Sequence, residues 1–299
     1  MQIYPDCKSP PEDVPVFKDK PEWGATPTGL DQKNIAFWNE LCGSHLAEVL
    51  GIRDSSPASL KKFDDWFLAY YPYVFYHIPF DELKDKDVLE VGLGYGTIAQ
   101  RLAESGARYI GLDVADGPVA MAKHRFQQAR LHGGVKQGSI LDAPFEDSSF
   151  DMIVTIGCLH HTGDLQKAIN ECRRMLRPGG KLMMMLYYAY SYRRWIQARG
   201  ETLRYFWREV FGCRNVVHPK HETEKWDYDH NSKGEAAPHT DFVSVRSLKS
   251  MCKHFSAFDW RLENINVEPP FQNWRSRREL LKTWRPQVFG LEIYATATK

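Results

Sequence analysis

The chain has 299 residues, of which 43% are hydrophobic and 26% are charged, and its formal net charge is +1. This composition is typical of a globular protein, and the balanced charge gives no global electrostatic reason to expect nucleic-acid binding. The six cysteines form no C-x-x-C pair, so reduced thiols are expected. Because the N-terminus lacks a signal-peptide pattern and the longest apolar run, residues 182–190, is too short to span a bilayer, we expect a cytoplasmic protein without a membrane partner.

The N-terminal part, residues 1–80, is predicted to be a helical extension. Residues 1–30 are rich in proline and charge and are expected to be irregular, whereas Asp31 is placed to cap a first helix. Ser56-Pro57 is a typical helix start. An aromatic patch follows: Trp66, Phe67, Tyr70, Tyr71, Tyr73, Phe75 and Tyr76. These rings either pack in the core or form a lid over a ligand, and both interpretations can hold for different members.

Residues 87–97 have the pattern of a buried strand, a glycine-rich turn and a helix start. Gly92, Gly94 and Gly96 allow a tight turn and a close approach to a ligand at the helix N-terminus. The dinucleotide fingerprint requires a third glycine at position 97, where this chain has Thr97. A carboxylate just before the glycines, Glu90, suits a cationic ligand.

Further strands follow at regular intervals. The strand at 108–113 ends in Asp113, which lies 19 residues after Gly94, the separation at which a carboxylate binds ribose hydroxyls; a helix cap is the alternative. Strands are also expected near 135–140, 152–156 and 181–188, alternating with helices. The alternation of apolar and polar residues predicts two late strands at 258–267 and 288–298.

Three stretches together resemble the class I S-adenosylmethionine (SAM) methyltransferases, in particular small-molecule enzymes of the "methyltransferase type 11" kind. They are the glycine run, the APFEDSSFD segment at 143–151 and LRPGG at 176–180, and the resemblance is continuous from about 86 to 189. It implies an α/β fold with a doubly wound, seven-stranded Rossmann-like sheet, mostly parallel with an antiparallel last strand. The SAM-binding domain would cover residues 81–299, with a cap inserted at about 190–245.

The resemblance also implies which residues hold SAM. In the family an acid faces the adenine amino group, but here that position is Ser139, and the nearby Asp142 is the candidate substitute. The candidate cofactor-binding residues are Glu90, Gly92, Leu93, Gly94, Gly96, Asp113, Val114, Ser139, Ile140, Asp142 and Gly157.

Candidate catalytic groups are three histidines. His160 and His161 follow the fourth strand, and His239 has Asp241 nearby to orient it; a purely structural role is the alternative for each. The candidate substrate-binding residues are Tyr70, Tyr73, Tyr187, Tyr188 and Arg194. The pairs Cys158 with His160 and His218 with His221 complete no four-ligand set, so no metal is expected.

The insertion is basic and aromatic in its first part. Leu203, Trp207 and Val210 share a helical spacing, which predicts a cap helix packed over the sheet edge. Its basic residues suit a solvated face, a wall for an anionic substrate, or an RNA-facing patch. The polar residues 218–238 are expected to form a loop.

The sequence therefore predicts SAM-dependent methyl transfer to a small molecule, with oxygen or nitrogen favoured as the accepting atom and sulfur or carbon left open. Two alternatives remain: an RNA methyltransferase, although the Pro-Pro-aromatic motif of base-amine enzymes is absent after the fourth strand, and a non-catalytic SAM-binding regulator. A nicotinamide oxidoreductase is disfavoured by Thr97. The sequence leaves the oligomeric state open, including a homodimer.

Overall fold

The computed structural model describes residues 29–40 and 44–299, and the segment 1–28 that was expected to be irregular lies outside them. Its centre is one seven-stranded sheet in the order β3-β2-β1-β4-β5-β7-β6, in which β7 runs antiparallel to both of its neighbours. This confirms the predicted fold class. The strands are β1 (Asp87–Val91), β2 (Arg108–Asp113), β3 (Gly134–Gln137), β4 (Phe150–Ile156), β5 (Leu176–Tyr187), β6 (Ala257–Glu263) and β7 (Glu292–Thr298).

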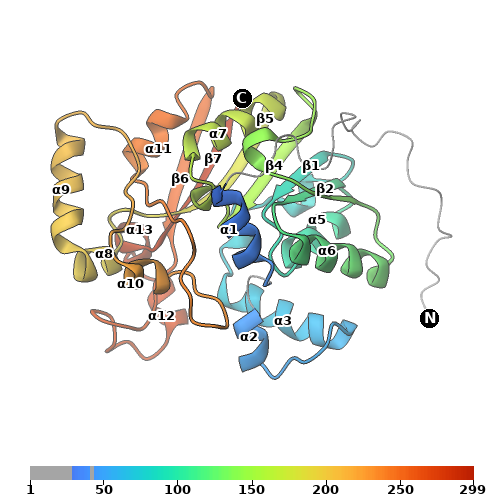
Figure 1. The fold of residues 1–299 in the computed structure, drawn as a ribbon, viewed down its shortest axis with the longest axis horizontal. Helices are drawn as coiled ribbons and strands as arrows, with labels where there is room; N and C mark the ends of the chain where they lie inside the picture. Colours follow the sequence, from blue (N-terminus) through green and yellow to red (C-terminus); the bar gives the residue numbers. More distant parts are fainter. Residues whose placement is uncertain (1–28, 41–43) are drawn as a thin grey trace.

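Helices flank the sheet, with α9 at the left of the picture and α2 and α3 below the sheet (Figure 1). They are α1 (Gly29–Trp38), α2 (Ser44–Val49), α3 (Pro57–Tyr70), α4 (Val74–His77), α5 (Thr97–Glu104), α6 (Asp116–Ala129), α7 (Leu165–Met175), α8 (Tyr192–Gln197), α9 (Arg199–Val210), α10 (Glu222–Trp226), α11 (Val245–Met251), α12 (Arg277–Leu281) and α13 (Pro286–Phe289). None of the helices in the described ranges has the length and apolar character needed to cross a membrane.

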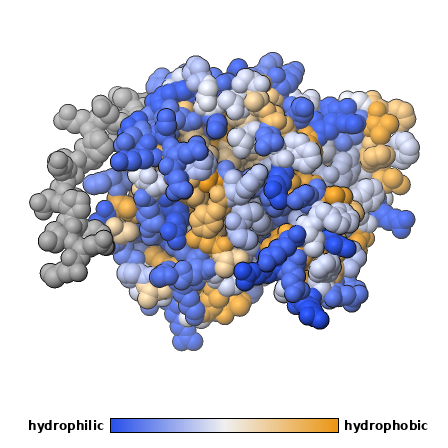
Figure 2. Space-filling view, turned by 180° about the vertical axis from the view of Figure 1, so that it is seen from behind, coloured by the Kyte–Doolittle hydropathy of each residue, from blue (hydrophilic) through white to orange (hydrophobic). Residues whose placement is uncertain are grey.

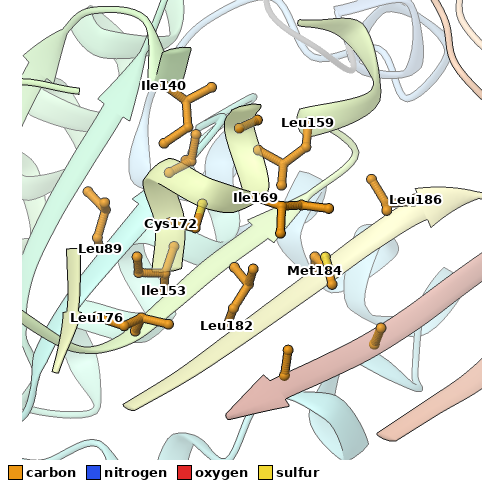
Figure 3. Packing of buried hydrophobic residues seen from close by; sticks show 14 of the residues in the cluster. Leu89, Ile140, Ile153, Leu159, Ile169, Cys172, Leu176, Leu182, Met184 and Leu186 are labelled. Carbon is orange, nitrogen blue, oxygen red and sulfur yellow. The ribbon is translucent and has the colours of Figure 1, made fainter. Parts of the chain in front are cut away.

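The two faces of the sheet carry separate hydrophobic cores. On one face, strand residues such as Leu89, Ile153 and Leu182 pack against Ile169 and Cys172 of α7 (Figure 3). The other core includes side chains of α5 and α6 together with α4. Because the strand order reverses between β1 and β4, a crevice is expected at the carboxyl ends of these two strands.

Local signals for turns and caps were confirmed at some positions and shifted at others. Ser56 caps α3, as predicted, and Asp164 caps α7. Asp31, in contrast, lies inside the first turn of α1. The LRPGG turn falls within β5, where the register shifts and Gly179 has φ 77°. The strand predicted at 288–298 begins only at Glu292, because Pro286–Phe289 form α13.

The predicted orientation of α9 is wrong. Leu203, Trp207 and Val210 are 45%, 51% and 48% exposed, so the apolar stripe faces outward. Figure 2 shows hydrophobic residues at the right-hand edge, where α9 lies after the half turn from Figure 1. The buried face instead contains Glu209, which accepts hydrogen bonds from Ser244, Ser247 and Tyr190 and thereby fixes the rotation of the helix.

A buried ion pair joins the N-terminal helices to the glycine turn. Arg125 of α6 donates both terminal nitrogens to the Asp64 carboxylate of α3 at 2.9 Å, and its Nε donates to the Tyr95 carbonyl at 2.7 Å. The Thr97 hydroxyl donates to the same carboxylate at 2.6 Å. The position of α3 over the turn therefore depends on this cluster.

Replacing Arg125 with methionine is expected to lower the free energy of unfolding by about 3 kcal/mol, because the Asp64 carboxylate would stay buried without its cation. Urea unfolding followed by circular dichroism measures this loss. The exposed Lys123→Met on the same helix is the control. The double variant Arg125→Met/Asp64→Leu should regain stability, and a single variant as stable as the wild type would contradict the argument.

Candidate functional site

A cavity of about 470 Å³ lies at the carboxyl edge of the sheet. Its floor is formed by the glycine turn and by the ends of β2, β4 and β5 with the start of β7. Side chains of α1 and α3 and the segment 228–231 complete its walls. The segment that was predicted to be a loop thus contains α10 and contributes to the site.

The glycine turn has a backbone conformation that favours glycine at two positions. Gly92 and Gly96 have φ 83° and 78°, conformations that favour glycine. A Cβ at Gly92 would lie 2.5 Å from the Cβ of Cys158, so a side chain there would collide with the β4 loop. Gly96 then precedes α5, and Thr97 and Ile98 at the start of this helix line the cavity.

Asp113, at the end of β2, is held by the backbone of the turn. Its Oδ2 accepts from the Leu93 N–H at 2.7 Å and its Oδ1 accepts from the Ala115 N–H at 2.9 Å. Burial raises the pKa of this carboxyl to about 6, against the lowering effect of these backbone hydrogen bonds. Each carboxylate oxygen keeps a further lone pair for a ligand hydroxyl.

Glu90 lies beneath the turn and is buried. Burial raises the pKa of its carboxyl to about 8, and the hydrogen bond from the Tyr109 hydroxyl, at 2.6 Å, lowers it only in part. The nearby Asp113 adds to the rise. A cationic ligand would stabilise the ionised form of this carboxyl.

We expect the wild type to lose folding stability as the pH rises from about 5 to about 8, and Glu90→Gln to remove most of this loss. Below the pKa that Glu90 has in the unfolded chain, its carboxyl is protonated in both states. Above that pH the carboxyl ionises in the unfolded chain but stays protonated in the folded protein, so folding stability falls. The fall ends when the pH passes the folded-state pKa of about 8. The neutral glutamine lacks this loss, which is on the order of 4 kcal/mol. Urea unfolding across this pH range measures it.

The control for this experiment is the exposed Glu104→Gln, which should keep the wild-type pH dependence. An equal pH dependence in the wild type and Glu90→Gln would contradict the argument.

The structure brings most of the candidate cofactor-binding residues to the cavity. Ser139 lines it and also accepts from the Leu141 N–H at 3.3 Å. Gly96 and Asp142 are not among the lining residues. The candidate residues that line the cavity are Glu90, Gly92, Leu93, Gly94, Asp113, Val114, Ser139, Ile140 and Gly157.

Of the three candidate histidines, His161 lines the cavity. Its Nδ1 is 2.6 Å from the carbonyl of His239, so Nδ1 donates and the neutral ring keeps its lone pair on Nε2. Nε2 is buried, has no hydrogen-bond partner in the described part of the chain and lies 3.4 Å from Oδ2 of Asp229. His161 is thus placed to take a proton and to share the resulting charge with Asp229.

His160 and His239 do not line the cavity. His160 is buried between the rings of His161 and Tyr187, and burial lowers its pKa well below the usual range. The His239 ring contacts Asp241 at 3.0 Å, as expected. His239 contacts the site through its backbone carbonyl, which accepts from Nδ1 of His161.

Tyr187 is the one candidate substrate-binding residue that reaches the cavity; Tyr70, Tyr73 and Tyr188 do not line it. Arg194 is buried and donates to Glu224 at 2.7 Å, away from the cavity. The structure instead adds Asn34, Asp229 and Glu292 to the site. The alternation in β7 places Glu292 on one face of the sheet, but no sequence signal identified Asn34 or Asp229.

Two groups of side chains have the composition of metal sites. His160, His161 and Asp229 form one, and His218, His239 and Asp241 form the other; within each, the potential ligand atoms lie within 4.8 Å of one another. These groups differ from the pairs considered in the sequence. The first includes the proposed proton acceptor, so its response to chelators is informative.

Comparison with known proteins agrees with this geometry. Residues 89–184 match the family model of the "Methyltransferase domain". The chain is 33% identical over 99 residues to a probable S-adenosylmethionine-dependent methyltransferase of Mycolicibacterium smegmatis. It is 34% identical over 100 residues to the ubiquinone biosynthesis O-methyltransferase of Coxiella burnetii.

Both matches cover 33% of this chain, and they span 37% and 43% of the two relatives, less than half of their lengths. Among solved structures, a putative S-adenosylmethionine dependent methyltransferase from Listeria monocytogenes superposes with a TM-score of 0.53 at 16% identity, covering 77% of this chain and 97% of that one. This structural similarity supports the fold.

Proposed function

We propose that this chain, whose residues 89–184 match the methyltransferase domain, is a class I SAM-dependent methyltransferase that uses SAM as its cofactor and methylates a small molecule. The observation that carries the proposal is one continuous cavity that contains the glycine turn and Asp113 together with His161 and Tyr187. The relative from Coxiella is named as an O-methyltransferase of ubiquinone biosynthesis, which supports a small-molecule acceptor. Oxygen and nitrogen are the favoured accepting atoms.

The residues present fit the cofactor. The glycine turn lines the cavity through Gly92 and Gly94, and the buried Glu90 and Asp113 offer carboxyl groups to a cationic, ribose-containing ligand. We assign Asp113 to the ribose hydroxyls, Glu90 to the amino-acid end and the Gly92–Gly96 backbone to close contact. Val114, Ser139 and Ile140 are assigned to the adenine side.

SAM supplies a methyl group on a sulfonium that already contains the leaving group. The protein must therefore position the acceptor in line with this methyl group and keep water away. His161 accepts the acceptor's proton at Nε2, Asp229 stabilises the imidazolium, and the His239 carbonyl fixes the ring. Tyr187, whose hydroxyl donates to Asp229 at 2.8 Å, fixes the carboxylate.

The direct test is calorimetric titration with SAM and, separately, NADH, followed by transfer of labelled methyl groups to the small-molecule and RNA fractions of a cell extract. We expect micromolar SAM binding, no NADH binding and label in the small-molecule fraction. Label in RNA alone would favour an RNA methyltransferase. SAM binding without transfer to either fraction would favour a regulator, and absence of SAM binding would overturn the proposal.

We also propose a cytoplasmic location, which the free thiols of Cys172, Cys213 and Cys252 support, because thiols stay reduced in that compartment. The partner of the chain is the small-molecule substrate, and nucleic acid is disfavoured by the balanced net charge of +1. Size-exclusion chromatography with light scattering would decide between a monomer and a homodimer.

A further inference from the structure

Among the described residues, the side chains that line the cavity include several carboxyl groups but no lysine or arginine. This statement covers the described residues around the cavity, which include carboxyl groups on both the turn side and the opposite wall. The lining carboxyl-bearing residues are Asp31, Glu40, Glu90, Asp113, Asp229 and Glu292. An anionic acceptor would be repelled here, whereas a cation would be attracted.

Several acceptor atoms lie near His161. Oδ1 of Asn34 is buried and has no hydrogen-bond partner among the described residues, while the amide nitrogen of Asn34 donates to the His161 carbonyl at 2.9 Å. Nε2 of His161 and the Asp229 carboxylate add further acceptors. Since buried polar atoms in proteins are normally hydrogen-bonded, we expect this cluster to bind a ligand that donates hydrogen bonds.

Aromatic rings surround the same place. The Trp38 ring lies 4.9 Å from the His161 ring, and the Tyr187 and Tyr228 rings lie 4.7 Å apart. All of these residues line the cavity. Aromatic faces attract cations and also bury apolar ligand surface.

The arginines of the insertion do not offset this charge. Arg194 is paired with Glu224 at 2.7 Å and Arg193 with Glu268 at 2.6 Å, and neither lines the cavity. The interpretation of the basic insertion as a wall for an anionic substrate therefore finds no support at this site.

Glu292, next to Tyr187 in the β5–β7 register, supplies a second carboxyl on the acceptor side. Burial raises its pKa to about 7, although hydrogen bonds from Asn264 and Tyr73 lower it in part. A cation in the cavity would favour its ionised form.

Resting on the methyltransferase function proposed above, we propose that the acceptor is a primary or secondary amine on an apolar or aromatic body, with its nitrogen bound by Asp229 and Asn34. The nitrogen of the amine donates to the Asp229 carboxylate and to Oδ1 of Asn34, and the rings of Trp38, Tyr187 and Tyr228 enclose the body.

The corresponding transfer balances without a further reactant. The bound ammonium first gives one proton to Nε2 of His161, which frees the lone pair on nitrogen, and this proton then passes to water. The lone pair forms a bond to the methyl carbon, the electron pair of the breaking carbon–sulfur bond passes to sulfur, and the methylated nitrogen keeps its remaining protons as an ammonium. The products are the methylated amine and S-adenosylhomocysteine.

The test uses three compounds with one body: 2-phenylethylamine, 2-phenylethanol and phenylacetate. Their binding to the full chain is measured by calorimetry in the presence of saturating S-adenosylhomocysteine. We expect the amine to bind about 10- to 100-fold more tightly than the alcohol, the difference expected for one hydrogen bond to a charged group, and phenylacetate to bind most weakly. Asp229→Asn should remove this preference.

Asp227→Asn is the matched control, because Asp227 is two residues away, accepts from Gln197 and does not line the cavity. Equal binding of the amine and the alcohol, or an amine preference that survives Asp229→Asn, would overturn the amine assignment. No amine binding to a protein that does bind S-adenosylhomocysteine would overturn it as well. Failure to bind either SAM or S-adenosylhomocysteine would instead overturn the proposed function.

Discussion

Asp113→Ala is expected to weaken SAM binding on the order of a thousandfold. Two ribose hydroxyls would lose a charged acceptor, and a hydrogen bond to a charged group contributes about 1.5–3 kcal/mol. The variant also removes the acceptor for the Leu93 and Ala115 N–H groups, which hold the glycine turn against β2. Calorimetric titration with SAM measures the loss.

The control is Asp116→Ala, because Asp116 is exposed in the first turn of α6 and does not line the cavity. Thermal unfolding of both variants separates lost binding from lost structure. A dissociation constant for Asp113→Ala within about threefold of the wild type would show that the ribose assignment is wrong.

The raised pKa of the Asp113 carboxyl leads to a prediction of how SAM binding depends on pH. The pKa of Asp113 is raised to about 6, so the carboxylate is present above this pH and is lost as the pH falls through it. Because a protonated carboxyl is a poorer acceptor, SAM affinity should fall in the wild type below about pH 6. Asp113→Asn, which does not titrate at this position, should lack the fall that begins near pH 6, whereas a fall that begins near pH 8 belongs to Glu90 and should remain.

The parts of the fold that could be predicted depend on local signals. Val88, Leu89 and Val91 form an apolar run followed by glycines, and Asp113 ends the next strand at a separation typical of ribose-binding carboxylates. Each of these signals lies within a few residues of the feature that it predicts. The elements from 86 to 189 were therefore placed in the correct order.

The parts that were missed depend on contacts between distant segments. Asp229 reaches the site because Tyr187, 42 residues earlier, donates to its carboxylate. The spacing of Leu203 and Trp207 identified a helix but not its rotation, which follows from the contacts of Glu209 with Ser244 and Ser247.

The charge of an arginine likewise does not reveal its partner. The sequence contains both Arg194 and Glu224, but only the structure shows that the two pair in a buried position instead of binding substrate. Local patterns thus predicted the glycine turn and Asp113 at the cavity floor, whereas the presence of Asn34 and Asp229 in its walls depends on tertiary contacts.

His161→Ala is expected to lower kcat by about 10²–10⁴, the usual contribution of a positioned general base. In the proposed mechanism the ring accepts its proton at Nε2, which lies 3.4 Å from Oδ2 of Asp229 and has no hydrogen-bond partner in the described residues. Since none of the candidate cofactor contacts involves this imidazole, the dissociation constant for SAM should change by less than about threefold. Single-turnover kinetics with the acceptor found by the labelling experiment measures the chemical step.

His230→Ala is the control, because His230 also lines the cavity but is exposed and stacks on Trp226. Its effect on kcat should be small. Equal losses in both variants would mean that the cavity tolerates no change of shape and that His161 has no special part in proton transfer.

A chelator distinguishes proton acceptance from metal binding at the same side chains. His160, His161 and Asp229 could together hold a metal ion, and loss of such an ion would also lower kcat in His161→Ala. With His161 as a general base, the wild type should keep its rate after dialysis against EDTA. A rate that falls with EDTA and returns with a divalent metal would show that His161 is a metal ligand and not a base. A nitrogen bound to metal has no lone pair left for the proton.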